Sequence, residues 1–362
     1  MSGSISLSGP APYGVLGRLI ADAGATRARL DQLTTQVASG RMGEAYADLG
    51  AGARVSLDLR PAIALQQTWQ ANIDAASGRM QVTQAAMEQI GQIAADFNAK
   101  LNSVNALNPP EIDSIATAAR DALRTVAGLL DSKNGDVYVF AGQDTANAPV
   151  PGADAILTSG FYTQIAAAVG GLAGAGAPAT IAATLGIASS NAPGTSPFSA
   201  YLSQPAVILQ AAAPTVEIGP QQREPTGVPA SANGFALATG TSSTGSYMRD
   251  VMRALATIGA MSSSQVNVPG FSALVQDTQT SLRDVVADLA TDAGVLGDKQ
   301  ARLQSIRTQL DTTQTAMTGQ VSAVEDVDMA ATLSRLSLVQ TQMQASYQMI
   351  AGFTNFSLVK FL

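Results

Sequence analysis

The sequence predicts a mainly α fold, in which the N- and C-terminal segments form a long antiparallel coiled-coil helical bundle and a β-rich or irregular domain is inserted between them. Two observations carry this prediction. Apolar residues recur at steps of three and four over both ends of the 362-residue chain, as they do in coiled-coil helices. Ten of the sixteen prolines lie between Pro149 and Pro229 and none follows Pro269, so the last part of the chain permits very long helices.

The first expected helix ends at Ser39-Gly40, because glycine commonly follows the last turn of a helix. A second helix is expected from Trp69 to Val104, where apolar or small residues recur at alternating steps of four and three. The stripe of the first helix is Leu16, Leu19, Ala23, Leu30, Leu33 and Val37. The stripe of the second is Trp69, Ile73, Ala76, Met80, Thr83, Met87, Ile90, Ala94, Phe97, Leu101 and Val104.

A third helix follows the Pro109-Pro110 break and ends at the turn Asp131–Gly135, before a short strand over Val137–Phe140. Its stripe is Ile112, Ala116, Ala119, Leu123, Val126 and Leu130. The section 143–243 comes next and differs in kind, since it is rich in Gly, Ala, Pro, Ser and Thr and has a single charge, Asp154, between residues 145 and 216. We therefore expect a separate module there.

The C-terminal part shows the strictest periodicity, with apolar residues seven apart over more than forty residues. They are Leu282, Leu289, Leu296, Leu303, Leu310, Met317 and Val324, supplemented by Val285, Ile306 and Val327. A last stripe follows near the end of the chain. Because each end of the chain carries an apolar stripe that no sequence neighbour covers, we expect the two ends to pair with each other and then with other copies.

The residues expected to form this assembly interface come from both ends. They are Leu16, Leu19, Leu30, Leu33, Val37, Leu333, Leu336, Met343, Tyr347, Ile350, Phe353, Phe356, Leu358, Phe361 and Leu362.

The composition excludes several classes of function. The chain has no histidine and no cysteine, which excludes Ser-His-Asp and Cys-His catalysis and zinc sites with His or Cys ligands. The net charge of −7 argues against a nucleic-acid partner, which requires a basic surface. The sequence has no apolar stretch of 18 residues, so no membrane span is expected. Residues 1–10 lack the pattern of a cleavable signal peptide.

Four short motifs resemble chemical sites, and each is better explained as structure. The glycine cluster Gly170–Gly176 lacks the Lys-Ser/Thr of a phosphate loop and is expected to be a flexible loop. Ser357–Lys360 lacks the companion motifs of penicillin-recognising enzymes, and Asp131–Asp136 lacks calcium-loop spacing and is expected to be a turn. The acidic run Glu325–Asp328 is expected to be a solvated helix face or a capping box begun by Ser322, with a charged contact to a neighbouring subunit as the alternative.

No catalytic residue, metal site or cofactor is therefore predicted. Trp69 and the methionines at 80, 87 and 317 lie in register with the stripes, which favours core packing over a ligand pocket.

Several segments resemble the bacterial flagellin family. At the C-terminus they are Glu325–Ala330, Leu333–Leu336, Gln342–Tyr347 and Phe356–Leu362; at the N-terminus Leu33–Arg41 matches the family's L-x-x-Q-x-x-S-G-[KR] element. Within the family, Asn72–Met80, Val137–Gly142 and the final Phe-Leu are most similar to the hook–filament junction members, the third hook-associated proteins. The resemblance covers roughly residues 14–142 and 245–362. Tyr46–Gly50 replaces the family's usual acidic element, and 143–243 matches nothing recognised.

The resemblance implies a non-enzymatic structural protein of the bacterial flagellum, exported unfolded through the type III apparatus and located outside the cell. It further implies a terminal layer, 1–45 with 318–362, that lies inside the assembly and orders on polymerisation; a helical bundle, 46–142 with 244–317; and an outer domain, 143–243. Implied partners are other copies of the chain, a neighbouring hook-associated protein, flagellin and an export chaperone, with no nucleic acid and no membrane.

Three functions stay open at this point. The first is a junction protein that connects hook to filament and seats the first flagellin subunits. The second is a filament-forming flagellin. The third is a secreted coiled-coil binding module, such as an adhesin or a phage-tail component.

Overall fold

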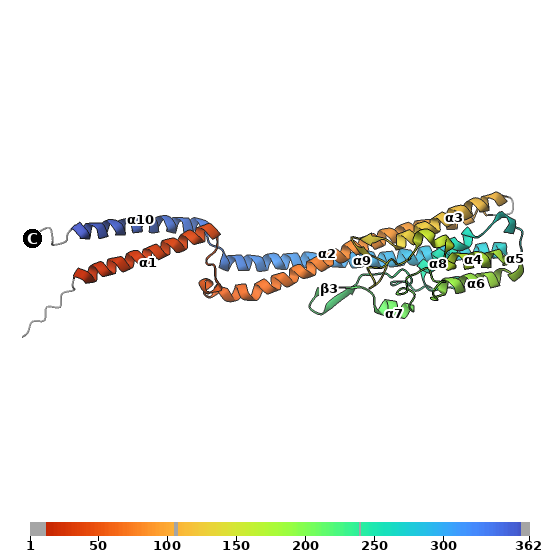
Figure 1. Cartoon of the computed structure of the whole chain (residues 1–362), viewed down its shortest axis with the longest axis horizontal. Helices are drawn as coiled ribbons and strands as arrows, with labels where there is room; N and C mark the ends of the chain where they lie inside the picture. Colours follow the sequence, from red (N-terminus) through yellow and green to blue (C-terminus); the bar gives the residue numbers. More distant parts are fainter. Residues whose placement is uncertain (1–11, 105–107, 239, 356–362) are drawn as a thin grey trace, which may run out of the picture. The chain divides into compact units, whose positions relative to one another are not determined.

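The computed structural model describes residues 12–104, 108–238 and 240–355, with side chains between residues 17 and 352 of these ranges. The predicted mainly α fold is confirmed (Figure 1). Three helices precede the section 143–243: α1 (Pro12–Ser39), α2 (Gly52–Leu101) and α3 (Pro109–Leu130). Three follow it: α8 (Tyr247–Gly259), α9 (Phe271–Glu325) and α10 (Met329–Asn355).

The described part of the section 143–243 holds short helices as well as a hairpin. They are the 3-10 helix η2 (Ala153–Thr158) and the α-helices α4 (Gly160–Gly170), α5 (Leu172–Ala175), α6 (Ala177–Ser189) and α7 (Ala206–Ala211). Strands β3 (Thr215–Gly219) and β4 (Gln222–Pro225) pair antiparallel. Alanine favours helices more than any other residue, which explains helix in a section whose prolines and glycines indicate irregular structure.

Two short motifs turn out differently from each other. The glycine cluster Gly170–Gly176 is not a flexible loop, because it ends α4 and contains α5. The turn at Asp131–Asp136 is confirmed: β1 (Lys133–Asn134) and β2 (Val137–Tyr138) pair across it, and Gly135 has a φ of +60°, which suits glycine. Short 3-10 helices η1 (Tyr46–Leu49) and η3 (Ser263–Gln265) complete the described elements.

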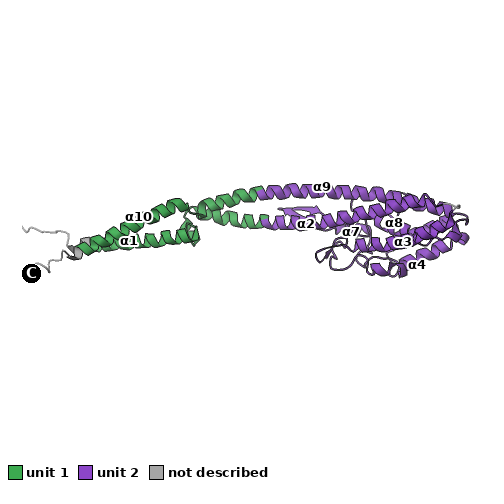
Figure 2. Cartoon of the chain, turned by 90° about the horizontal axis from the view of Figure 1, so that it is seen from above, with its two compact units in different colours: residues 1–66, 312–362 green, residues 67–311 purple. Residues whose placement is uncertain are grey.

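The chain divides into two compact units (Figure 2). Unit 1 comprises residues 1–66 and 312–362, and unit 2 comprises residues 67–311. Helices α2 and α9 contribute residues to both units. The three-part division expected from composition and resemblance stays a prediction.

The predicted apolar stripes form the core of unit 2. The α2 stripe from Trp69 to Leu101 and the whole α3 stripe are buried, as are Leu282, Leu289, Leu296 and Leu303 on α9. Ile73, Ala76 and Met80 pack with Leu296, Leu303 and the β3 residues Val216 and Ile218. Helix α8 is buried along its whole length and packs against α3, α4 and α6.

Buried polar contacts attach the inserted section to this core. The Asp292 carboxylate on α9 accepts hydrogen bonds from the backbone N–H groups of Gly234 (2.7 Å), Phe235 (2.9 Å) and Ala236 (2.5 Å). The Tyr247 hydroxyl donates to the same carboxylate at 2.7 Å. Arg253, 1% exposed, pairs with Asp277 at 3.0 Å and donates to the Ser242 carbonyl at 2.8 Å. Each buried charge thus has partners, as buried charges require.

Candidate assembly interface

Unit 1 contains an antiparallel pair of helices, α1 and α10, that pack against each other. The less exposed positions of each helix recur at steps of three and four, the spacing of a coiled-coil seam. On α1 they are Leu19, Ala23, Thr26, Leu30, Leu33 and Val37. On α10 they are Thr332, Leu336, Val339, Met343, Ser346 and Ile350. The pairing of the two ends predicted from their stripes is therefore present in the structure.

The expected interface residues fall into three groups. Leu33 is buried, and those half-buried in the seam are Leu19, Leu30, Val37, Leu336, Met343 and Ile350. Leu333 (48% exposed) and Tyr347 (49% exposed) lie outside the seam, where Thr332 and Ser346 take the positions facing α1. The side chains of Leu16 and Phe353 lie outside the described residues, as do Phe356, Leu358, Phe361 and Leu362.

Helix α10 also presents large apolar side chains away from the seam. At about 100° per residue, Met329, Leu333 and Tyr347 share one face, while Leu338 and Met349 share another. Leu338 is 59% exposed and Met349 is 52% exposed. Ile20 adds a further exposed apolar side chain on α1. The pair thus offers apolar surface on more than one side, which is typical of helices that contact several neighbours.

Each of the two chain segments of unit 1 has a break in its helical structure, and the two breaks lie next to each other. Helix α1 ends at Ser39, where Gly40 has a φ of +71°, and α9 ends at Glu325. Arg41 and Asp326 form an antiparallel β-bridge between the two interruptions. In it, Met42 N–H donates to the Glu325 carbonyl at 2.7 Å and Val327 N–H donates to the Gly40 carbonyl at 3.0 Å.

The expectation for the acidic run Glu325–Asp328 is wrong. It is neither a solvated helix face nor a capping box, because α9 ends at Glu325 and α10 begins at Met329, and Ser322 lies inside α9. The Asp328 carboxylate instead accepts the Ala331 N–H at 3.0 Å and so caps α10. Sequence periodicity missed this break because the apolar steps of three and four continue through it, from Val324 to Val327.

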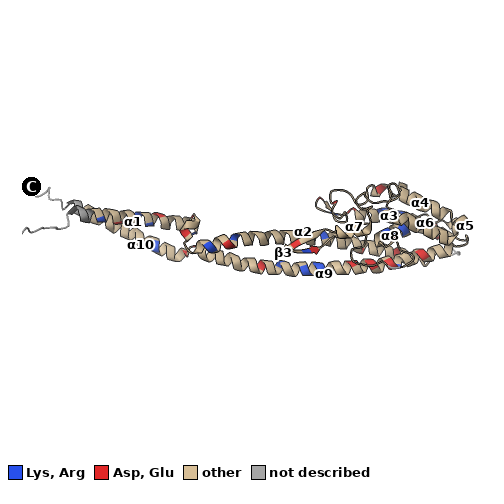
Figure 3. Cartoon of the chain, turned by 90° about the horizontal axis from the view of Figure 1, so that it is seen from below, with Lys and Arg blue, Asp and Glu red and all other residues tan. Residues whose placement is uncertain are grey.

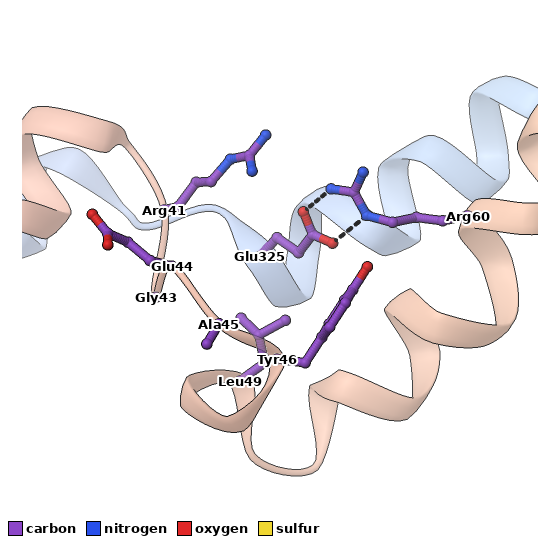
Figure 4. Close-up of a pocket in the computed structure, with 8 residues that line it drawn as sticks. All are labelled: Arg41, Gly43, Glu44, Ala45, Tyr46, Leu49, Arg60 and Glu325. Atoms are coloured by element: carbon purple, nitrogen blue, oxygen red, sulfur yellow. Dashed lines mark hydrogen bonds and ion pairs between the residues drawn. The ribbon is translucent and has the colours of Figure 1, made fainter.

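The side chain of Glu325, which precedes the bridge residue Asp326, makes several hydrogen bonds. This side chain is 9% exposed and accepts hydrogen bonds from Nη2 and Nε of Arg60, the latter at 2.8 Å (Figure 4). It also accepts a hydrogen bond from Ser56 Oγ. Hydrogen bonds from Arg60 and then Ser56 lower the pKa of Glu325 to about 2, and the positive charge of Arg60 adds to the effect. The pKa of Arg60 is raised by the same hydrogen bond. No pattern in the sequence indicates this pair, because its two residues lie 265 positions apart.

A cavity of about 330 Å³ lies beside this pair. It is lined by Arg41, Gly43, Glu44, Ala45, Tyr46, Leu49, Arg60 and Glu325 (Figure 4). Its rim is formed by η1 and the turn before it, where the Asp48 carboxylate accepts the Ala45 N–H at 3.0 Å. Within the described residues, no group of three or more acidic side chains is arranged to hold a metal ion.

Two models of known protein families match this chain, one in its N-terminal part and one in its C-terminal part. The bacterial flagellin N-terminal helical region matches residues 19–145, and the bacterial flagellin C-terminal helical region matches residues 278–362. The chain belongs to the flagellin family. A comparison with curated proteins gave no significant match.

Membership of the flagellin family identifies the chain as a structural, non-enzymatic component of the bacterial flagellum. Flagellins are extracellular and polymerise into helical assemblies, so other copies of the chain are partners. In the described part of the chain, none of the helices is long and apolar enough to cross a membrane. The matched regions contain most of α1, all of α2 and α3, most of α9 and all of α10.

Proposed function

We propose that this flagellin-family chain is a hook-associated junction protein, which connects the hook to the filament and seats the first flagellin subunits. The segments most similar to junction members are Asn72–Met80 and Val137–Gly142. The two segments lie close together in the fold. Strand β2 at Val137–Tyr138 pairs with β1, and Asn134 of β1 lies next to Gly78 of α2. A Cβ added at Gly78 would lie 3.3 Å from the amide nitrogen of Asn134. This shared surface carries the proposal.

In this function, α1 and α10 provide the contacts that build the assembly. Their mutual seam leaves Met329, Leu333 and Tyr347 on one exposed face of α10 and Leu338 and Met349 on another. Repeated contacts between different surfaces of successive copies produce a ring or a helical tube. We propose that these helices form the inner layer and that 143–243 lies outside it. A neighbouring hook-associated protein and flagellin are then the axial partners, and an export chaperone is the partner before assembly.

The alternative within the same family is a flagellin that forms the filament itself. The family matches favour it as strongly as the junction role, since both members share the terminal helices. The two functions differ in position and copy number. A flagellin predicts that the purified chain extends filament seeds into long filaments, whereas a junction protein adds only a short layer.

Immunogold labelling of intact flagella by electron microscopy separates these functions. A short labelled band at the distal end of the hook is the result expected for a junction protein. Label along the whole filament would overturn the proposal in favour of a flagellin. Label away from flagella would favour a secreted binding module, for which the isolated segment 143–243 should fold and bind a ligand.

A further inference from the structure

Helix α7 carries two aliphatic side chains that project from unit 2. Val207 is 77% exposed and Ile208 is 50% exposed; we call these two residues the α7 knob. The helix beneath them is fixed, because Leu209 is 3% exposed and Gln210 Nε2 donates to the Asn233 carbonyl at 3.2 Å. The knob is therefore held in place rather than carried on a loose loop.

The surroundings of the α7 knob are uncharged. Residues 201–214 contain no Asp, Glu, Lys or Arg, and α7 is drawn without charged residues in Figure 3, whereas α9 carries many. Leu237, on the segment that Gln210 contacts through Asn233, is 85% exposed. Exposed apolar surface of this kind gains about 25 cal/mol per Å² when covered.

Unit 2 also contains a groove with matching chemistry. It has a volume of about 380 Å³ and lies between α2 and α9. Its walls include the small residues Gly91, Ala95, Ala290 and Ala293 together with Val286 and Leu289; we call it the α2–α9 groove. Glu88 is the one charged residue of its lining. Small side chains on both helices leave room for aliphatic side chains from outside.

The knob and the groove lie on different faces of unit 2. On α9, Asp292 and Leu296 face the inserted section, which they contact through residues 234–236 and β3. Val286 and Ala290 of the groove lie roughly 120° and 160° around the helix from Asp292, at about 100° per residue. Figure 2 likewise draws α7 on the side of unit 2 away from α9. A copy therefore presents a projecting apolar surface on one side and a receiving one on another.

We propose that the α7 knob of one copy docks into the α2–α9 groove of a second copy. The inference rests on the self-assembly of the flagellin family and not on the junction role in particular. Joining two different surfaces makes the contact heterologous, so it repeats from copy to copy around a ring or along a helix. The knob carries no charge, and Glu88, the one charged residue of the groove lining, is exposed, so docking at the apolar part of the groove buries no unpaired charge at the centre of the contact.

The contact is small, so a second copy is expected to occupy the groove only when the copies are already assembled. Two aliphatic side chains and their surroundings bury far less than the roughly 1,000 Å² that a stable pair of proteins needs. The contact therefore does not hold two free copies together. It forms where other interfaces, above all those of α1 and α10, already bring the copies side by side.

Disulfide trapping tests this proposal cleanly, because the natural chain has no cysteine. The test variant carries Val207→Cys together with Ala290→Cys, and the control carries Val207→Cys with Ala301→Cys, an exposed position of α9 outside the groove. Flagella are sheared from cells that express each variant and are oxidised mildly, and the chain is then separated on non-reducing gels. The expected result is a ladder of covalent dimers and larger species for the test variant only, with monomers alone in dilute solution.

Each other outcome contradicts the proposal in an identifiable way. Dimers from Val207→Cys alone indicate that knob meets knob, and equal cross-linking in the control indicates that α9 is not contacted at the groove. Monomers from the test variant in flagella that contain the chain show that the contact does not form. Reducing gels report whether the chain is in flagella at all, which tests the proposed function separately. If it is absent there, the same pair is examined in polymers of the concentrated chain, and failure there also overturns the contact.

Discussion

Glu325 ties three segments of unit 1 together through one residue. Its carbonyl accepts the N–H of Met42 at 2.7 Å, next to the end of α1, while its carboxylate pairs with Arg60 of α2. Because Glu325 is also the last residue of α9, the break that starts α10 is fixed from both sides. The carboxylate with its two donors, Arg60 and Ser56, thus acts together with the backbone bridge of Arg41 and Asp326 to hold this break.

Replacing this carboxylate by its neutral isostere is expected to loosen unit 1. Glu325→Gln keeps the shape but removes the negative charge, and it replaces one accepting oxygen by an NH2 group that cannot accept a hydrogen bond from Arg60 or Ser56. We expect a loss of about 1–2 kcal/mol in the stability of unit 1, measured by thermal unfolding and by proteolysis between α9 and α10.

The matched control is Asp326→Asn, which removes an exposed carboxylate one residue further along. It is expected to leave unfolding and proteolysis unchanged, within about 0.5 kcal/mol. Equal effects of the two substitutions would show that general charge, rather than the contact with Arg60, determines the stability of the bridge.

Acid is expected to weaken the same contact over a defined range of pH. The pKa of Glu325 is about 2 in the folded chain against an ordinary value of 4.5, so the unfolded chain binds the proton more readily. The contribution of the pair is complete above the ordinary pKa and is lost as pH falls through about 2. Circular dichroism and proteolysis between pH 6 and pH 2 should show this loss in the natural chain. Glu325→Gln should show a flatter profile, and an identical profile would exclude Glu325 as its source.

The long helices could be predicted from the sequence because their burial follows a simple period. Ile73 to Leu101 on α2 and Leu282 to Leu303 on α9 are buried where steps of three and four place them. On α10 the expected stripe agrees with the seam at Leu336, Met343 and Ile350. That Thr332 and Ser346 take seam positions while Leu333 and Tyr347 lie outside could not be predicted, because large apolar side chains occur on several faces of this helix. A period also carries no information on contacts such as that of Arg60 with Glu325, which depend on how distant segments meet.

The position of the seam on α10 leads to a prediction that distinguishes the pairing of α1 with α10 from assembly with other copies. Val339 lies in the seam and is 4% exposed, whereas its neighbour Leu338 is 59% exposed. Val339→Asp buries a carboxylate without a partner and should cost at least about 2 kcal/mol, with loss of the α1–α10 pair. Leu338→Asp should leave the isolated chain as stable as before but reduce its incorporation into flagella.

Thermal unfolding and the amount of chain in sheared flagella measure these two effects independently. Normal incorporation of Leu338→Asp would show that this face of α10 is not covered by a neighbour. Unchanged unfolding of Val339→Asp would show that the seam contributes little to the stability of the free chain.

The hydrogen bonds of the buried Asp292 carboxylate give a test within unit 2. Asp292→Ala and Tyr247→Phe are expected to lower the stability of unit 2 by different amounts. Asp292→Ala leaves the N–H groups of Gly234, Phe235 and Ala236 without their acceptor. Since each unpaired buried donor costs about 1–3 kcal/mol, the loss should exceed about 3 kcal/mol. Tyr247→Phe removes one donor and leaves the carboxylate its three backbone partners, so about 1 kcal/mol is expected.

Amide hydrogen exchange at residues 234–236 distinguishes this account from a general loss of stability. Asp292→Ala should release protection at these three amides before the rest of unit 2 exchanges, while Tyr247→Phe should keep it. Burial and the nearby Asp292 charge raise the pKa of Tyr247 well above its ordinary value, so its hydroxyl stays protonated and donates throughout the neutral range. Retained protection in Asp292→Ala would mean that apolar contacts hold residues 234–236 in place. The hydrogen bonds to the Asp292 carboxylate would then not be needed for that conformation.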